Sequence, residues 1–329
     1  MADIREPIDI VYCWCDGSDP EFKARKNKYL ANREQNDDIG DLRFWDNNEL
    51  KYSLRSLEKN LSWVHHIYIV TDRQVPKWLD QTNPKVTVVD HTQILPADLI
   101  PTFASTVIER YLHKIPGLSE KFIYANDDIF INKPLSPAFF FKGNKPRVRM
   151  THYERFREVK DEQDFQAKFA QVATWMQTNL NVWKLLFQKY GKHEFYVSPH
   201  TIDGYTKTLF SEVLEKYRDA FAVADKERFR SKDCITRSIF GLDMVYSGKA
   251  DLEIVEKPGF WEKHIHHDKH KELKCYCGSE NAKTRHQILR FEPDTFCVNA
   301  DAKCNLQDKK DMQDFYEQLF PEPSAFEKK

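Results

Sequence analysis

Four short, nearly continuous apolar segments in the N-terminal part of the chain constrain the fold most strongly. They are Ile8–Trp14, Ile67–Val70, Val86–Val89 and Phe122–Ala125. Segments that are apolar at consecutive positions, rather than at alternate ones, are typical of parallel strands covered on both faces. Amphipathic stretches separate several of them, so strands and helices alternate along the chain. The sequence therefore predicts an open α/β sheet.

Helical patterns occupy intervals between and after these segments. Residues 47–60 carry leucines on one stripe, and Asp46 followed three residues later by Glu49 has the spacing of a capping box. A second helix is expected over residues 103–111. A last helix, with its apolar residues in phase, should end before Pro321.

The pattern changes in the middle of the chain, which predicts three parts. We expect residues 1–140 to form the first half of an α/β core, 141–195 to form a helical insertion or cap, and 196–329 to complete the core. The apolar stripe of the insertion consists of Phe165, Phe169, Val172, Met176 and Leu180. Further helices are expected over residues 203–217 and 232–242.

Two acidic clusters follow predicted strands, where open parallel sheets bind their ligands. Asp16-Gly17-Ser18-Asp19-Pro20 follows the first strand, and its short side chains and amides could meet a nucleotide or form only a solvated turn. Asn126-Asp127-Asp128 follows the fourth strand. Adjacent carboxylates repel each other unless a cation or a proton offsets their charge, so this cluster suits Mg²⁺ or Mn²⁺. Alternatively one carboxylate takes a proton from an attacking hydroxyl, or the cluster is an exposed turn.

A histidine and an arginine in the last part of the chain are candidate phosphate ligands. His200 lies in Ser198–Asp203, which we expect to open a helix whose free amides would help to bind phosphate. Arg230 lies in a basic run, and a guanidinium can bind two phosphate oxygens at once. A structural histidine and a solvated basic face are the alternatives at these two positions.

Histidines and cysteines gather within the charged stretch 250–290. The residues concerned are His264, His266, His267, His270, Cys275 and Cys277. A structural Zn²⁺ would accept such ligands, but their spacing matches none of the usual zinc patterns. The chain has seven cysteines, and this odd number excludes a fully paired set of disulfides within one chain. The cysteines therefore favour a reducing compartment.

Charge and hydropathy exclude several classes of protein. The chain has 50 basic and 51 acidic residues, so its balance indicates neither a nucleic acid nor an anionic membrane as partner. The N-terminal sequence does not resemble a secretory leader, and no apolar run is long enough to span a membrane, so any membrane association is expected to be peripheral. Kinase, dehydrogenase, serine hydrolase and zincin motifs are missing from the sequence.

Several segments, in the same order, resemble the Stealth family. That family includes microbial capsule polysaccharide phosphotransferases and the lysosomal-enzyme N-acetylglucosamine-1-phosphotransferase. The similar segments are Ile8–Pro20, Arg43–Asn60, His66–Leu79, Leu99–Pro134, Val197–Tyr205, Phe229–Asp233, Phe296–Asn299, Phe315–Tyr316 and Phe320–Ser324. The chain departs from the family's pattern at Cys13, Cys15 and Ala104, and after Asn299.

The resemblance implies a Rossmann-like, glycosyltransferase-A-like sheet and a transfer reaction. A hexose 1-phosphate, expected to be that of an N-acetylhexosamine, would pass from a UDP-sugar to a carbohydrate hydroxyl, with release of UMP and participation of Mg²⁺ or Mn²⁺. Asp128 would be the general base, Asp127 would support it or bind Mg²⁺, and His200 and Arg230 would hold the pyrophosphate. The donor would also be contacted by Asp16, Gly17, Ser18, Asn47, Glu49, Arg55, Asn126 and Asn299.

Three other functions stay open at this level. A metal-dependent glycosyltransferase would use the same acidic cluster, attack the anomeric carbon and release UDP. A carbohydrate-binding protein would keep the fold and the aromatic residues without catalysis, and a zinc-stabilised interaction module is the third alternative. We expect a cytoplasmic enzyme of capsule or exopolysaccharide synthesis, which would lie at the inner membrane only peripherally. The sequence does not predict the oligomeric state.

Overall fold

The computed structural model describes residues 6–30, 40–152, 161, 163–164, 167, 173–192, 194–255, 272–301 and 303–329. Two predictions fall partly outside these residues. They are the stripe positions Phe165, Phe169 and Val172, and the histidines His264, His266, His267 and His270. Among the described helices, none is long and apolar enough to cross a membrane.

The centre of the molecule is a five-stranded sheet in the order β3-β2-β1-β4-β9. Its strands are β1 (Ile8–Cys13), β2 (Ile67–Thr71), β3 (Val86–Asp90), β4 (Lys121–Asn126) and β9 (Asp203–Thr206). Neighbouring strands are parallel except for β9, which runs antiparallel to β4. The four strands predicted from the apolar segments are confirmed, and so is the open, mostly parallel α/β class.

Two smaller sheets complete the fold. One has the order β10-β7-β6, with β8 paired to β7, and the other has the order β11-β12-β5. Their strands are β5 (Ile129–Ile131), β6 (Phe141–Lys142), β7 (Lys145–His152), β8 (Tyr196–Val197), β10 (Asp251–Ile254), β11 (Glu272–Cys277) and β12 (Thr295–Ala300). Because β5 follows β4 after a two-residue turn, the second acidic cluster lies where the central sheet meets the β11-β12-β5 sheet.

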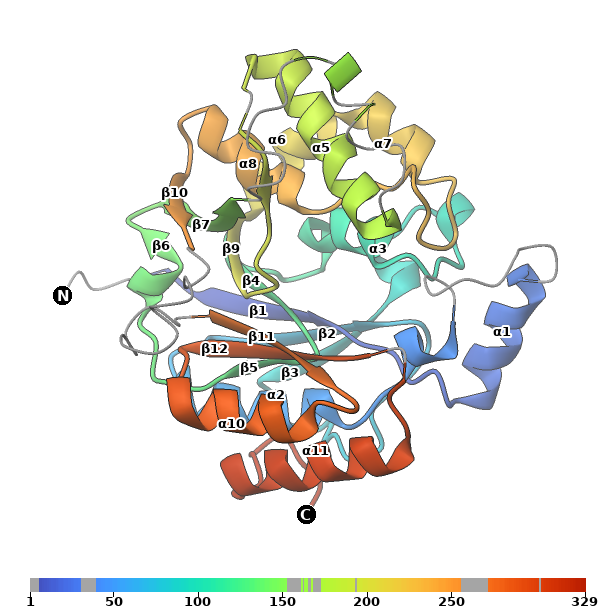
Figure 1. The fold of residues 1–329 in the computed structure, drawn as a ribbon, viewed down its shortest axis with the longest axis vertical. Coiled ribbons are helices and arrows are strands. Elements are labelled where there is room, and N and C mark those ends of the chain that lie inside the picture. Colours follow the sequence, from blue (N-terminus) through green and yellow to red (C-terminus); the bar gives the residue numbers. More distant parts are fainter. Residues whose placement is uncertain are drawn as a thin grey trace.

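Helices cover both sides of these sheets (Figure 1). In the view of Figure 1, α5, α6, α7 and α8 lie above the central strands, whereas α10 and α11 lie below. The helices are α1 (Pro20–Leu30), α2 (Glu49–Asn60), α3 (Ser105–Arg110), α5 (Thr174–Tyr190), α6 (Lys207–Lys216), α7 (Arg218–Ala224), α8 (Ser238–Tyr246), α10 (Asn281–Phe291) and α11 (Leu306–Leu319). Short 3-10 turns include Asp41–Phe44 before α2.

The central strands are buried on both faces, as their unbroken apolar sequences predict. In β1, Val11 packs into the cluster formed with α6 and α8, whereas its neighbours Ile10 and Tyr12 pack into the cluster that contains the α2 leucines. In β4, Phe122 and Ile123 divide between the same two clusters. The alternating direction of strand side chains thus places one core on each face of the sheet.

Several predicted boundaries are wrong. Helix α2 begins two residues later than expected, and Asn48 precedes it in the left-handed region (φ 58°) without a side-chain cap, so the predicted capping box is absent there. Residues 203–206 form β9 instead of a helix, because they pair with the edge of β4. The later helix is α8, which starts at Ser238 rather than at residue 232.

The middle and late parts of the chain also differ from expectation. Within 141–195 the structure has the strands β6 and β7 before α5, so that stretch is not uniformly helical. The stretch 250–290 contains β10, β11 and α10, although it lacks a clear periodicity. The last predicted helix is confirmed as α11, and Met312, Phe315 and Tyr316 on its buried face join the core below the sheet. The proposed three-part division of the chain stays a prediction.

Candidate active site

A cavity of about 790 Å³ opens at the carboxyl ends of β1 and β4. The chain proceeds from β1 to β2 and β3 on one side and returns as β4 on the other, so these two strands flank the switch point at which open α/β sheets bind ligands. Residues of α3, α5, the start of α8 and the end of β12 complete the wall. The volume is in the range of small-molecule sites.

Most of the residues expected to do chemistry line this cavity. They are Glu49, Asn126, Asp127, Asp128, His200, Arg230 and Asn299. They come from α2, the end of β4 and the turn after it, the loop before β9, the loop before α8, and β12. The fold therefore brings together side chains that are far apart in the sequence, although it does not by itself assign a role to any of them.

Four carboxylates form what we term the acidic group: Glu49, Asp127 and Asp128, which line the cavity, and Asp46, whose charge acts on Glu49 and Asp127. Burial, and then the charges of Asp128, Glu49 and Asp46, raise the pKa of Asp127 well above its ordinary value. Burial and the charge of Asp46 raise the pKa of Glu49 to about 8. Burial likewise raises the pKa of Asp46 to about 6 and that of Asp128. The acidic group favours a proton or a cation.

The two oxygens of Asp128 have different surroundings. Oδ2 accepts hydrogen bonds from the Asn299 side-chain amide and from the Cys297 thiol, the latter at 3.4 Å. Both partners lie on β12, which pairs with β5 directly after Asp128, and the Val298 amide donates to the Asp128 carbonyl at 3.1 Å. Oδ1 is buried and has no hydrogen-bond partner among the described residues. One oxygen is thus fixed, and the other still needs a donor.

His200 lies on the same cavity wall as two arginines, Arg230 and Arg237, which we term the cationic pair. It stands between β8 and β9 with φ 63°, so its expected position at a helix N-terminus is wrong. Burial, and then the charges of Lys274, Arg237 and Arg230, lower the pKa of His200 well below its ordinary value. The imidazole is therefore neutral at pH 7 and can donate one hydrogen bond.

The loop that carries Arg230 is anchored to the start of α3. The Phe103 amide donates to the Arg228 carbonyl at 2.7 Å, and the Phe103 and Phe229 rings stack with centroids 5.0 Å apart. Phe22 and Phe44 join this aromatic cluster from α1 and the turn before α2. Burial of these rings holds the Arg230 loop at the cavity.

The predicted cluster after β1 builds a turn and does not line the cavity. Asp16 Oδ1 accepts hydrogen bonds from the Ser18 amide and hydroxyl at 2.8 and 2.6 Å. The Gly17 amide donates to the Phe44 carbonyl, and a Cβ on Gly17 would lie 2.4 Å from that oxygen, which excludes any larger residue. Among the described residues the cavity wall contains Cys13, Cys15 and Phe44 instead. The turn thus shapes the wall from behind, and direct donor contacts of Asp16, Gly17 and Ser18 stay a prediction.

Asn47 and Arg55 are likewise absent from the cavity wall among the described residues. The Asn47 side-chain amide donates to the Lys309 carbonyl at 3.1 Å and ties the start of α2 to α11. The Arg55 guanidinium donates to Glu327 at 2.8 and 2.9 Å, to Glu317 at 3.0 Å and to the Phe320 carbonyl at 2.9 Å. Arg55 therefore fastens the C-terminal segment to α2, and its expected place beside the donor needs correction.

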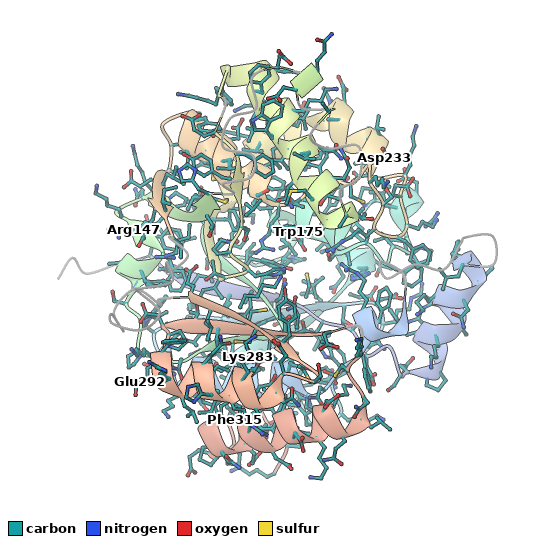
Figure 2. All side chains as sticks on the ribbon, in the orientation of Figure 1. Arg147, Trp175, Asp233, Lys283, Glu292 and Phe315 are labelled. Atoms are coloured by element: carbon teal, nitrogen blue, oxygen red, sulfur yellow. The ribbon has the colours of Figure 1, made fainter. Side chains whose placement is uncertain are left out.

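Sequence reasoning missed several cavity residues. Glu109 on α3 and Arg237 before α8 look like ordinary helix-surface charges in the sequence, yet both are buried in the wall. Trp175 and Asn179 contribute the first turns of α5, and Figure 2 shows Trp175 between the upper helices and the central strands. Both fall inside predicted helices, and no local pattern in the sequence marks either of them as buried.

The donor set fits a Mg²⁺-type cation only if a substrate supplies part of its coordination. No group of three or more His, Cys, Asp or Glu residues suited to hold a metal occurs in the part of the chain that the structure describes. Mg²⁺ commonly binds through one or two carboxylates together with substrate phosphates and water. Asp127 and Asp128, with raised pKa values and an unpartnered oxygen, meet that requirement. The zinc hypothesis stays a prediction, because its histidines lie outside the described residues.

Comparisons with known proteins match three stretches of the chain to family models. Stealth protein conserved regions 1, 2 and 4 match residues 6–34, 43–148 and 286–329, and His200 and Arg230 lie between the last two stretches. The capsular polysaccharide phosphotransferase fcs1 of Haemophilus influenzae is 32% identical over 91% of this chain and 79% of its own length.

A second relative and a solved structure extend the comparison. The exopolysaccharide phosphotransferase cps2G of Lactiplantibacillus plantarum is 33% identical over 69% of this chain and 72% of its own length. The galactosyltransferase LgtC, solved with donor and acceptor sugar analogs, aligns over 96% of both chains at 11% identity with a TM-score of 0.43. The conserved regions and the extent of the sequence matches show that the chain belongs to the Stealth family.

Proposed function

We propose that this enzyme transfers a hexose 1-phosphate from a UDP-sugar to a hydroxyl of a carbohydrate acceptor and releases UMP. The observation that carries the proposal is that one cavity is lined both by the carboxylates Glu49, Asp127 and Asp128 and by His200 and Arg230. Transfer of sugar phosphate agrees with the family and with the names of its relatives, which are capsular and exopolysaccharide phosphotransferases. The UDP-sugar, the N-acetylhexosamine and UMP are our extension of that assignment.

In the proposed reaction, Asp128 accepts the proton of the acceptor hydroxyl. Its Oδ1 has no hydrogen-bond partner among the described residues, whereas Asn299 holds Oδ2 and so fixes the plane of the carboxylate. The raised pKa of Asp128, caused chiefly by burial, makes it a stronger base than an exposed aspartate. The acceptor oxygen then forms a bond to the β-phosphorus of the donor, and the bond from that phosphorus to the bridging oxygen breaks.

The leaving group departs with the electron pair of that bond, as UMP. Arg230 and neutral His200 would donate hydrogen bonds to the phosphate oxygens, on which negative charge is spread during the transfer. A Mg²⁺ ion held by Asp127 would neutralise charge on the diphosphate when bound. Because positioning and charge neutralisation supply most of the rate enhancement in phosphoryl transfer, few other protein groups are needed.

The proposal includes a reducing, cytoplasmic compartment and a carbohydrate acceptor of the capsule or exopolysaccharide type. All seven cysteines of the chain are free in the structure, which supports the first point. The names of the two relatives support the second.

Nucleotide release tests the proposal directly. The purified protein is incubated with UDP-N-acetylglucosamine, Mg²⁺ and a sugar acceptor, and the nucleotide products are separated. UMP together with a phosphodiester-linked product is the expected result. UDP would instead mean glycosyl transfer at the same acidic group, and the phosphodiester assignment would be abandoned.

A further inference from the structure

Arg237 is a buried arginine of the cavity wall that the proposed chemistry has not yet used. It directly precedes α8 and lines the cavity together with Arg230 and His200. Its side chain is only 10% exposed. A charge so deeply buried must be bonded to protein groups or to a ligand, because burial of an unpaired charge is costly.

The protein fixes one edge of this guanidinium firmly. Nε and Nη2 donate to Asp203 Oδ2 at 3.1 and 2.8 Å, and Nη2 also donates to the Thr201 carbonyl at 3.4 Å. The guanidinium carbon lies 4.6 Å from the centroid of the Tyr124 ring. Asp203 and Tyr124 are register partners on β9 and β4, so Arg237 is held against the central sheet.

The other edge of the guanidinium is left without an acceptor. A guanidinium has five N–H groups, two of them on Nη1. Within the described residues Nη1 makes no hydrogen bond, and its ion-pair partner there is Glu109 Oε2 at 3.9 Å, which is beyond hydrogen-bond distance. Glu109 accepts instead from the Tyr124 hydroxyl, at 3.4 Å.

The free edge calls for an anionic oxygen rather than a neutral one. Arg230 and Arg237 both act on the electrostatics of His200, so the three side chains face one region of the cavity. Asp203 and Glu109 offset part of the charge of Arg237, but within the described residues neither accepts a hydrogen bond from Nη1, so an anionic oxygen can bind there. Charge-assisted hydrogen bonds from a guanidinium to phosphate oxygens are shorter and stronger than those to neutral groups.

We propose that Arg237 is a second phosphate-binding arginine of this cavity, which donates through Nη1 to an oxygen of the donor diphosphate while Asp203 fixes its orientation. The inference rests on the proposed function in so far as the donor is a nucleoside diphosphate sugar. It assigns Asp203 as a positioning residue that acts through Arg237. No covalent step is attributed to either residue.

The test measures binding of inorganic pyrophosphate, UDP and uridine to the wild-type protein and to Arg237→Gln and Arg237→Lys. We expect Arg237→Gln to weaken binding of pyrophosphate and UDP roughly 10- to 100-fold and to leave uridine binding unchanged. The lysine variant keeps the charge but loses the fixed fork of donors, so its affinity for pyrophosphate should lie between those of the wild type and Arg237→Gln. It also provides the test if the glutamine variant fails to fold. Unchanged pyrophosphate binding in the folded variants would overturn the inference.

Two further variants separate phosphate binding from a structural role. Arg149→Gln is the matched control, because Arg149 is a buried guanidinium paired with Glu253 and Glu272 and does not line the cavity. It should leave pyrophosphate binding unchanged, and a loss equal to that of Arg237→Gln would contradict the inference. Asp203→Asn should weaken pyrophosphate binding less than Arg237→Gln does, since the guanidinium stays but is less firmly held.

The inference and the proposed function can fail independently. If the wild-type protein binds pyrophosphate through Arg237 but releases no UMP from a UDP-sugar, the phosphate site stands and the proposed reaction fails. If the wild-type protein releases UMP while Arg237→Gln binds pyrophosphate as tightly as the wild type does, the reaction stands and the role of Arg237 fails.

Discussion

Helix α2 contributes a charged residue to each of two groups, Arg55 to one and Glu49 to the other, and only the first group is neutralised by the protein itself. Arg55 lies between Glu327 and Glu317 and donates hydrogen bonds to both. Burial alone would raise the pKa of Glu327, but hydrogen bonds from Arg55 and the Ser324 amide, together with the charges of Arg55 and Lys51, lower it. At the start of the same helix, Glu49 belongs to the acidic group, in which every pKa is raised.

The difference shows where a ligand is needed. The Arg55 network contains its own countercharge, and Nε, Nη1 and Nη2 of Arg55 all donate to protein groups, so it requires no further partner. In the acidic group, Lys309 is the cation that acts on Asp46 and Glu49, yet the pKa values of both stay raised. Both groups contain several charges, but only the acidic group at the start of α2 lacks enough countercharge. This unbalanced charge therefore distinguishes the functional end of the helix.

The largest effect is expected from Asp128→Asn, which removes the proposed base from the unbalanced group. The variant is nearly isosteric and can still bond to Asn299, but its amide cannot take up a proton. We expect turnover, measured as UMP release at saturating donor, to fall on the order of 10³-fold. The affinity for UDP and the thermal stability should change little.

A matched control for this prediction is Asp314→Asn, at an exposed aspartate that pairs with Lys310 on α11. It removes a carboxylate of the same kind outside the cavity and should leave turnover unchanged. If Asp128→Asn lost UDP affinity in proportion to turnover, Asp128 would belong to donor or cation binding instead of to proton transfer.

The second prediction breaks the balanced network. Arg55→Met leaves the Glu327 carboxylate, whose side chain is 8% exposed, without its main cation. We expect the free energy of unfolding, measured by urea denaturation, to fall by about 3–5 kcal/mol, as for other broken buried ion pairs. UMP release per folded molecule should not change, because Arg55 does not line the cavity.

The double variant Arg55→Met/Glu327→Met sharpens this comparison, since it removes both charges at once. It should recover part of the lost stability, because no uncompensated charge remains. A loss of turnover in the folded Arg55→Met protein would restore Arg55 to the donor site predicted from the sequence.

The sequence predicted those features that depend on local pattern. The four central strands were recognisable because residues such as Ile10 and Val11 are buried on opposite faces, which requires consecutive apolar residues. The position of Asp127 and Asp128 in the cavity followed from the rule that ligands gather at strand ends. Asn299 came from the family resemblance alone, whereas His200 was also chosen from an expected helix start that the structure does not have.

Features that depend on tertiary pairing could not be predicted. Strand β9 is short and begins with Asp203, and only its antiparallel pairing with β4 makes it a strand. Glu49 and Arg55 stand six positions apart on one helix, and nothing local distinguishes the one that meets a cavity from the one that meets Glu327. Arg237 and Glu109 resemble surface charges until α3 and α8 are packed against the sheet.

The smallest expected effect concerns the pH dependence of stability. Because the pKa of Glu49 is raised from 4.5 to about 8, the folded chain holds a proton that the unfolded chain has already lost at intermediate pH. The free energy of unfolding therefore falls as pH rises through this interval. Neutral histidines such as His200, whose pKa is lowered, act in the opposite sense, but only below their ordinary pKa of 6.5. The interval from pH 6.5 to 8 therefore reports on carboxylates.

Between pH 6.5 and 8, the free energy of unfolding of Glu49→Gln should fall by on the order of 1 kcal/mol less than that of the wild-type protein. Glutamine keeps an oxygen that can accept from the Asn47 amide but has no charge to titrate. Millimolar Mg²⁺ should flatten the decline in the wild type more than in the variant, since a cation compensates the same charges. Glu317→Gln is the control from the balanced network, and its decline should match the wild type because the Glu317 pKa is lowered. A wild-type stability that rises from pH 6.5 to 8 without Mg²⁺ would mean that the acidic group is balanced after all.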